Sequence, residues 1–315
     1  MAKIITLTVN PAIDKSTSVA GIRPNSKLRC TTPVFEAGGG GINVSRVIEE
    51  LGGSSLCMYL AGGPTGAHLK IMLSETNIKQ HIIPIQGWTR ENLAITDTTL
   101  DQQYRFGMPG PTVTEEECLT TLTQLETFLA KGDYLVASGS LSPGMPIDFF
   151  AKVAALANRN GVRFILDTSG EALISGAQAG VYLLKPNLGE LSALCGGGSI
   201  SYSQLEVSAK KFLKNNPCEV LVVSLGPQGA IVVTKESVER ITAPIVHQQS
   251  TIGAGDSMVA GMLLALSQGK TIGEMVRYGV ACGTAATMSP GTQLCQKKDV
   301  DALYKWLTSK DRKRT

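Results

Sequence analysis

The sequence predicts an α/β protein whose mainly parallel sheet is flanked by helices on both faces. Short apolar, β-branched runs alternate with segments of helical period over most of the 315 residues. Several of these runs are apolar at consecutive positions, which is typical of strands covered on both faces. The composition, with 43% hydrophobic and 17% charged residues, is that of a globular domain. Ligands are therefore expected at the carboxyl ends of the strands.

The individual elements follow from this alternation. The apolar runs predict strands over Ile4–Val9, Ser55–Leu60, Tyr134–Ser138, Phe164–Asp167, Val181–Leu184, Val220–Ser224 and Ile231–Thr234. Segments of helical period predict helices over Glu115–Ala130, Ile147–Asn160, Ser203–Lys214, Gly255–Ser267 and Thr271–Met288. Pro146 marks the start of the second of these helices, and Asn160-Gly161 marks its end.

Two polar segments, residues 14–36 and 88–108, interrupt the alternation. Period-two patterns in both, such as Tyr104-Arg105-Phe106, predict hairpins that project from the main sheet. Both segments are rich in cations, namely Arg23, Lys27, Arg29, Arg90 and Arg105. Since the chain shows no internal repeat and no low-complexity linker, residues 1–315 are interpreted as one domain.

Composition also argues against several classes of protein. A net charge of +3 provides no field that would require nucleic acid or a membrane surface as a partner. The seven cysteines form no CxxC or Cys/His cluster, which argues against a disulfide framework and a structural zinc. The longest apolar stretch, Met258–Leu266, is about half a membrane span, and the first residues lack a signal-peptide pattern. The sequence therefore predicts a cytoplasmic protein, and its basic residues 310–314 are expected to be a frayed end.

Four consecutive glycines, Gly38–Gly41, lead into an expected helix. Their spacing is not that of a dinucleotide-binding GxGxxG motif, and Gly269-Lys270-Thr271 lacks the earlier glycine of a P-loop. Such a segment lets the backbone approach a ligand closely, with helix N–H groups directed at it. A tight turn is the alternative interpretation.

The segment Thr251–Ser257, which reads TIGAGDS, is the most informative motif. Its glycines allow successive N–H groups to converge at the start of a helix, as an anion hole for a transferring phosphoryl group requires. Asp256 in the first turn can accept a proton from an attacking hydroxyl, and a loose transition state does not require its pKa to be raised. The alternative is that Asp256 only caps the helix.

Further polar segments follow the expected strands. In Lys185–Glu190, Asn187 and Glu190 share one helical face suited to a hydrated magnesium ion, although the same spacing also forms a capping box. Lys185 either contacts a nucleotide phosphate or reaches solvent. The loop Ser224–Ala230 either covers a nucleotide or joins a hairpin. Ser138–Gly144 and Asp14 could face sugar hydroxyls, and a turn is the alternative for Asp14.

Taken in order, these segments resemble the ribokinase-like carbohydrate kinases of the phosphofructokinase B family. The matching segments are Asp14, AGGGGINVSR at 37–46, SGSLSPG at 138–144, KPNLGE at 185–190, SLGPQGA at 224–230 and STIGAGDS at 250–257. They span nearly the whole chain. The resemblance implies a ribokinase-like, doubly wound sheet with a small β-sheet lid over the sugar, formed by residues 14–36 and 88–108. It also implies a homodimer made through the lid.

The segment Thr6–Asp14 is similar to the branch of the family that phosphorylates sugar phosphates. Residues 27–44 and 104–110 resemble the members of that branch that act on fructose 6-phosphate, which implies transfer from MgATP to its C1 hydroxyl. The resemblance makes Asp256 the base and assigns the anion hole to the amides of Gly253, Ala254 and Gly255. It assigns sugar contacts to Asp14, Gly39, Asn43 and Ser140. It assigns the sugar phosphate to Arg90 and Arg105, with Lys27 and Arg29 from a partner subunit. It assigns the nucleotide site to Lys185, Asn187, Ser224, Gly226, Gly229 and Thr284, and magnesium to Glu190.

Some positions leave alternatives open. Ser250 stands where many members have Asp, in a region that binds a monovalent cation in some of them, so Ser250 and Ile252 are a candidate potassium site. Asn10 is shared with fructose-1-phosphate and tagatose-6-phosphate kinases, which keeps both substrates open. Ser142 replaces the Pro of close relatives, and His247 and Gln248 receive no role. A sugar-phosphate sensor without catalysis is the alternative from another class of protein.

Overall fold

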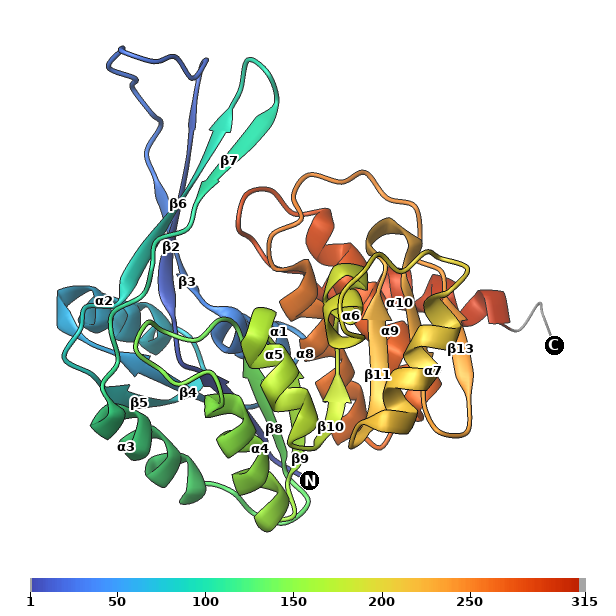
Figure 1. Cartoon of the computed structure of the whole chain (residues 1–315). Coiled ribbons are helices and arrows are strands. Elements are labelled where there is room, and N and C mark those ends of the chain that lie inside the picture. The colour runs from blue at the N-terminus through green and yellow to red at the C-terminus, as the bar shows by residue number, and fades with distance from the viewer. Residues whose placement is uncertain (1, 312–315) are drawn as a thin grey trace.

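A nine-stranded sheet forms the body of the protein (Figure 1), as a computed structural model that describes residues 2–311 shows. In spatial order its strands are β13 (Val238–Ile241), β12 (Ala230–Val233), β11 (Cys218–Ser224), β10 (Val181–Leu184), β9 (Arg163–Asp167), β8 (Tyr134–Ser138), β1 (Ile4–Thr8), β4 (Leu56–Ala61) and β5 (Lys79–Pro84). Neighbours from β11 to β5 pair in parallel, and β12 pairs antiparallel with both β11 and β13. The predicted α/β class is confirmed.

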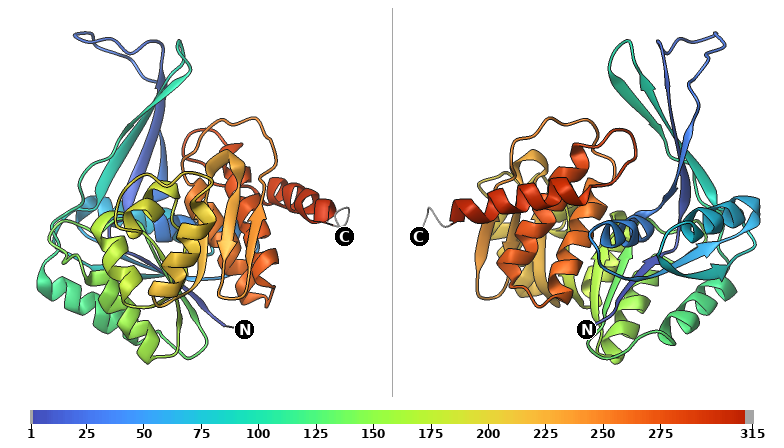
Figure 2. Two further views of the ribbon diagram at one scale, coloured as in Figure 1. Left: turned by 45° about the vertical axis from the view of Figure 1, so that its right-hand side comes forward. Right: turned by 180° about the vertical axis from the view of Figure 1, so that it is seen from behind.

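Helices cover both faces of this sheet (Figures 1 and 2). One face packs against α3 (Glu115–Glu126), α4 (Phe149–Arg159), α5 (Gly170–Gln178), α6 (Leu188–Leu194) and α7 (Leu205–Asn215). The other face packs against α1 (Gly40–Glu50), α2 (Gly63–Ser74), α8 (Ala254–Ser267), α9 (Ile272–Thr287) and α10 (Lys297–Asp311). Strand side chains alternate between the two: Met58 and Leu60 belong to the first core, and Cys57 and Tyr59 to the second side.

A second sheet of four strands projects from the body (Figures 1 and 2). Its order is β3 (Val34–Gly38), β2 (Ala12–Val19), β6 (Arg90–Asp97) and β7 (Gln102–Phe106). The pairs β2–β3 and β6–β7 are antiparallel hairpins, and β2 pairs with β6 in parallel. This small sheet therefore joins two segments that lie far apart in the sequence.

Several elements differ from the sequence-based expectation. Strands β5 and β13 and helices α2, α5 and α10 were not predicted, and α6 was anticipated only through the helical face of Asn187 and Glu190. Helix α2 contains Gly63, Pro64 and Gly66, which weaken a helical pattern, and Pro64 is tolerated because it lies in the first turn. Helix α3 ends at Glu126 instead of Ala130, and α4 begins at Phe149, after Pro146.

Two further expectations concern the end of the chain and membrane-spanning helices. Of the basic residues 310–314, those from 312 onward lie outside the described residues. Within residues 2–311, the helices are too short or too polar to span a membrane.

Candidate active site

The motif residues meet where the carboxyl ends of several parallel strands face the start of α8. Asn43 is buried on α1, and its Nδ2 donates to Oδ2 of Asp256 in the first turn of α8 at 2.8 Å. The first residue of α1, Gly40, lies directly against Ser138 at the end of β8. A Cβ added at Gly40 would be 2.3 Å from Oγ of Ser138. The glycines therefore permit this close approach of α1 to the end of β8.

The carboxyl group of Asp256 is electrostatically perturbed. Burial, reinforced by the nearby carboxylate of Asp167, raises its pKa to about 6, while the hydrogen bond from Asn43 and the charge of Lys185 oppose the shift. The sequence interpretation required no raised pKa, so this is a finding of the structure. A pKa near 6 leaves Asp256 mainly ionised at neutral pH, as a proton acceptor must be.

The backbone before Asp256 has the geometry of a helix N-terminus. Gly253 is the N-cap of α8 with φ of 71°, in the left-handed region that favours glycine. It also lies against Leu294, since an added Cβ would be 2.4 Å from Cδ2 of that side chain. The amide of Ala254 contacts the carbonyl of Thr251 at 3.5 Å, and the first α-helical hydrogen bond of α8 runs from the amide of Ser257 to the carbonyl of Gly253 at 2.8 Å. The amides before Ser257 make this end favourable for an anion.

Lys185, at the end of β10, is buried beside Asp167, at the end of β9. Their Nζ and Oδ1 atoms are 3.1 Å apart, and the two side chains are 7% and 15% exposed. Burial by itself would lower the pKa of Lys185, but the charge and hydrogen bond of Asp167, together with the charges of Glu190 and Asp256, raise the pKa overall. Asp167 was missed by the sequence analysis as a site residue, although its place as the last residue of a predicted strand was a usable signal.

Asn187 and Glu190 form the capping box that the sequence left as an alternative. The amide N–H of Glu190 donates to Oδ1 of Asn187 at 2.9 Å, and the amide N–H of Asn187 donates to Oε2 of Glu190 at 2.8 Å. Burial raises the pKa of Glu190, while Lys185 lowers it and Asp167 raises it further. Among the described residues, no group of three or more His, Cys, Asp or Glu side chains is arranged to hold a metal ion.

The remaining residues expected at the nucleotide lie on neighbouring elements. Ser224 ends β11 and forms a bridge with Asn187, so the two segments are adjacent. Gly226 and Gly229 bound a short 3-10 turn with φ of 56° and 93°. A Cβ added at Gly229 would lie 2.0 Å from the carbonyl oxygen of Ile241, whereas Gly226 faces open space. Thr284 lies on α9, beside Gly283, which packs on the start of α8.

In the small sheet, Asp14 lies in a row of three polar residues. It is in register with Glu36 on β3 and with Asn92 on β6. Nδ2 of Asn92 donates to Oδ1 of Asp14 at 2.8 Å, and the carboxylate lies so close to Gly38 that an added Cβ would be 2.0 Å from Oδ2. Burial raises the pKa of Asp14, and Asn92 and Arg90 oppose that shift. Neither Glu36 nor Asn92 was singled out from the sequence.

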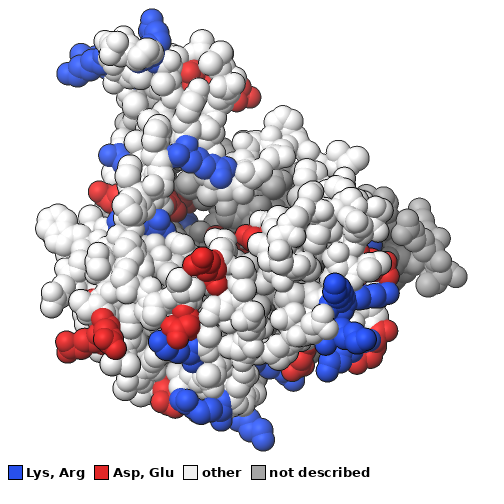
Figure 3. Space-filling view, in the orientation of Figure 1, with Lys and Arg blue, Asp and Glu red and all other residues white. Residues whose placement is uncertain are grey.

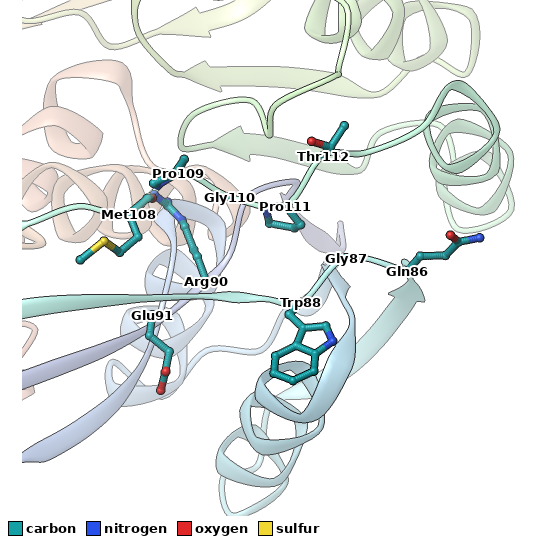
Figure 4. Close-up of a pocket in the computed structure, with 10 residues that line it drawn as sticks. All are labelled: Gln86, Gly87, Trp88, Arg90, Glu91, Met108, Pro109, Gly110, Pro111 and Thr112. Carbon is teal, nitrogen blue, oxygen red and sulfur yellow. The ribbon is translucent and has the colours of Figure 1, made fainter.

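Two arginines expected at the sugar phosphate differ in their surroundings. Arg90 donates from Nη1 to the carbonyl of Met108 at 2.9 Å and from Nη2 to the carbonyl of Asn10 at 3.0 Å. Figure 4 shows it pointing toward the segment with Met108 and Pro109, beside a pocket of about 590 Å³ at the base of the small sheet. Arg105 is exposed and donates to Oγ1 of Thr251 at 3.0 Å. The side chain of Arg90 thus links the backbone at Met108 to the backbone at Asn10, a role that the sequence did not predict.

Other expected residues are more scattered. Gly39 has φ of 106° and caps α1. The exposed Ser140 accepts from Nδ2 of Asn10 at 3.1 Å. Lys27 and Arg29 are exposed in the connection between β2 and β3, and Figures 1 and 2 show this connection at the end of the small sheet that lies away from the body.

In the candidate potassium site, the side chain of Ser250 has two hydrogen-bond partners within the protein. Oγ of Ser250 donates to the carbonyl of Gly291 at 2.7 Å and accepts from the amide of Ile252 at 3.2 Å. His247 and Gln248 are exposed nearby.

A pocket of about 240 Å³ lies between the small sheet and the body. Asp14, Asn92 and Arg105 line it from the sheet, and Ile252 and Thr292 line it from the body. The space-filling view shows the hollow that the small sheet overhangs (Figure 3). The half-buried carboxylate of Asp256 and the N-terminus of α8 thus lie close in sequence to Ile252, which lines this pocket opposite Arg105, and the arrangement suits a small anionic substrate.

Comparison with known proteins identifies the family. Residues 4–299 match the pfkB family of carbohydrate kinases. The chain is 42% identical over 309 residues to ATP-dependent 6-phosphofructokinase isozyme 2 of Escherichia coli, covering 98% of this chain and 100% of that protein. It is 39% identical over 302 residues to the isozyme 2 of Mycobacterium tuberculosis, covering 96% and 89%. A 1-phosphofructokinase of Bacillus subtilis is 32% identical over 286 residues, covering 91% and 93%. The chain belongs to the PfkB family.

Solved structures agree with this assignment. Phosphofructokinase-2 of Escherichia coli in complex with potassium gives a TM-score of 0.94 at 42% identity, and its complex with fructose-6-phosphate gives 0.92 at 41%. Its tetrameric inhibited form also gives 0.92 at 41%, and all three cover 98% of this chain and 100% of theirs. Ribokinase of Arabidopsis thaliana, at 18% identity and a TM-score of 0.73, covers 97% of this chain and 99% of its own and shares the fold.

Proposed function

We propose that this protein is an ATP-dependent 6-phosphofructokinase, which transfers the γ-phosphate of ATP to the C1 hydroxyl of fructose 6-phosphate. The observation that carries the proposal is the pairing of Asn43 with Asp256 at the start of α8, beside the pocket beneath the small sheet. The identity of about 40% over nearly the full length to two 6-phosphofructokinases supports the choice of substrate.

In this mechanism the small sheet acts as the lid. Asp14, Gly39, Asn43 and Ser140 bind the sugar, so that the C1 hydroxyl lies next to Asp256. Asp256 accepts the proton as the bond to phosphorus forms. The amides of Gly253, Ala254 and Gly255 stabilise the charge of the transferring group. Arg105 binds the 6-phosphate from β7, and Arg90 contributes charge from the base of the sheet.

The nucleotide lies across the ends of β10 and β11. Lys185 provides a positive charge near its phosphates, and the residues that line it are Asn187, Ser224, Gly226, Gly229 and Thr284. Oxygen ligands suit magnesium, and Glu190 and Asp167 are half-buried carboxylates close to Lys185 that fit it. Bound there, the ion would neutralise charge on the phosphate oxygens. Backbone carbonyls of Ser250 and Ile252 are the proposed potassium ligands.

The lid also supports a homodimer. Large hydrophobic side chains are exposed on the small sheet and its connections: Val34, Phe35, Leu100, Tyr104, Phe106 and Met108. A second copy would cover such a surface. It would also bring Lys27 and Arg29 of one chain toward the other's pocket. We place the enzyme in the cytoplasm, where its substrates are.

Product analysis tests this function. The protein is incubated with MgATP and fructose 6-phosphate, and phosphorus NMR follows the reaction. We expect one ADP for each new phosphate ester at C1. ADP without a sugar bisphosphate would contradict the proposal. Higher activity on tagatose 6-phosphate or fructose 1-phosphate would favour the kinases of those sugars, and binding without turnover would favour a sensor.

A further inference from the structure

Glu36 links the small sheet to the body, although no step of the proposed mechanism uses it. Its Oε1 lies 2.9 Å from Nη2 of Arg46 on α1, and its Oε2 accepts the hydroxyl of Thr292. Both charged side chains are shielded, with 24% of Arg46 and 13% of Glu36 exposed. Arg46 also donates to the carbonyl of Ala37 at 2.7 Å, which holds the end of β3 against α1. The carboxylate is therefore bound on both oxygens.

Thr292 belongs to the loop between α9 and α10 (residues 288–296), which also contacts the catalytic segment. The adjacent Gly291 accepts from Oγ of Ser250 at 2.7 Å. Two residues further on, Leu294 packs on Gly253, the N-cap of α8. The same short loop thus contacts the small sheet through one side chain and the start of α8 through its neighbours.

The contact between Glu36 and Thr292 joins the two sides of the pocket that lies between the small sheet and the body. Asp14 is in register with Glu36 on the sheet side, and Thr292 itself lines the pocket on the body side. Another contact between the sheet and the body, from Arg105 to Thr251, joins an exposed arginine to an exposed threonine. Hydrogen bonds shielded from water hold their geometry more firmly than exposed ones. The Glu36–Thr292 contact is therefore the firmer of the two.

We infer that Glu36 and Thr292 are positioning residues for the phosphoryl transfer: they hold the sugar-binding row of the small sheet in a fixed relation to the anion-binding start of α8. This inference rests on the proposed function. The sugar contact Asp14 and the base Asp256 are carried by different parts of the molecule, the small sheet and the body. A misplacement of about 1 Å can lower the rate of a reaction roughly 100-fold. Loss of the contact should therefore lower kcat with little change in the KM for ATP.

Thr292→Val tests the inference, because it removes the hydroxyl and keeps the shape. We expect kcat with fructose 6-phosphate to fall roughly ten-fold, as for loss of a hydrogen bond to a charged group, with the KM for ATP unchanged. Thr292→Ser should restore the rate. Thr123→Val is the matched control, since its hydroxyl donates within α3 to the carbonyl of Leu119. A wild-type kcat in Thr292→Val, or an equal loss in Thr292→Ser, would overturn the inference.

Amide hydrogen exchange provides a readout that does not depend on turnover. In Thr292→Val, exchange should quicken in residues 34–38 and 250–255 together, with the other strands unchanged. Quickening in neither segment, or throughout the protein, would contradict the inference. If that variant does not fold, Glu36→Gln takes its place, with the same expected pattern. A wild-type protein inactive on sugar phosphates would contradict the proposed function, whereas normal turnover in the variants would contradict only the positioning role.

Discussion

Nδ2 of Asn43 on α1 donates to Oδ2 of Asp256 on α8 at 2.8 Å, across 213 positions of the sequence. The bond orients the carboxylate before any substrate binds. It also favours the ionised form and so opposes the burial that raises the pKa of Asp256. The buried side chain of Asn43 therefore both orients the carboxylate of Asp256 and favours its ionised form.

Replacing Asp256 by Asn should remove the base and keep the shape of the site. We expect kcat to fall by ~10²–10⁴-fold with little change in the affinity for ATP, because the loss concerns the transition state. Steady-state kinetics measure this, with Asp148→Asn as the control. Asp148 is an exposed carboxylate that pairs with Lys152 on α4. An unchanged kcat in Asp256→Asn would show that another group accepts the proton.

The activity should have an acid limb set by Asp256. Its pKa of about 6 lies above the usual 3.8, so the carboxylate is lost as the pH falls through 6, and kcat should fall with it. The sign for stability is opposite. Burial disfavours the ionised form, so folding is relatively favoured below pH 3.8 and loses that contribution as the pH rises to about 6. Asp256→Asn should therefore melt higher than wild type at pH 8 and equally at pH 3.5. A gap that is the same at both pH values would contradict the raised pKa.

Substitution of Arg90 should mainly lower the stability of the protein, whereas substitution of Arg105 should mainly weaken binding of the sugar phosphate. Arg90→Ala removes two hydrogen bonds to backbone carbonyls, and we expect the free energy of unfolding to fall by about 2 kcal/mol. Arg105→Ala should leave stability within about 0.5 kcal/mol and raise the KM for the sugar phosphate roughly ten-fold. Urea unfolding and kinetics measure the two effects, with Arg23→Ala as an exposed control. Equal losses of stability in both variants would contradict this distinction.

Breaking the Lys185–Asp167 pair should be costly because one charge remains buried. We expect Lys185→Met to lower the free energy of unfolding by about 3–5 kcal/mol. Adding Asp167→Asn should recover part of this loss. Lys185 also lowers the pKa of Asp256, so the acid limb of the remaining activity should move to higher pH. An acid limb at the same pH as in wild type would show that Lys185 does not influence the pKa of Asp256.

Sequence patterns predicted the central strands best. Strands β8 and β10 have the predicted bounds because their apolar residues are consecutive and each is flanked by a glycine and a charged residue. Strand β13, Val238–Ile241, lies at the edge of the sheet, and its two central charged residues interrupt any apolar run or alternation. Helices that begin with glycine, such as α2 and α5, were missed because glycine lowers the helical signal.

The candidate site was predictable where a motif carries the chemistry, as at Asp256 and Asn43. The row of Glu36, Asp14 and Asn92 depends on the pairing of three strands, which no local pattern reveals. Arg90 was assigned to the sugar phosphate from the family resemblance and its charge, and its bonds to the carbonyls of Met108 and Asn10 become visible only in the fold.

A coupled assay of ADP release tests the central claim most directly. Wild type and Asp256→Asn are compared with MgATP and fructose 6-phosphate, tagatose 6-phosphate, fructose 1-phosphate, fructose and ribose. We predict the highest kcat/KM on fructose 6-phosphate in wild type, and its loss in the variant. A preference for another sugar phosphate would keep the mechanism and change the substrate, whereas no sugar-dependent ADP release from wild type would contradict the account.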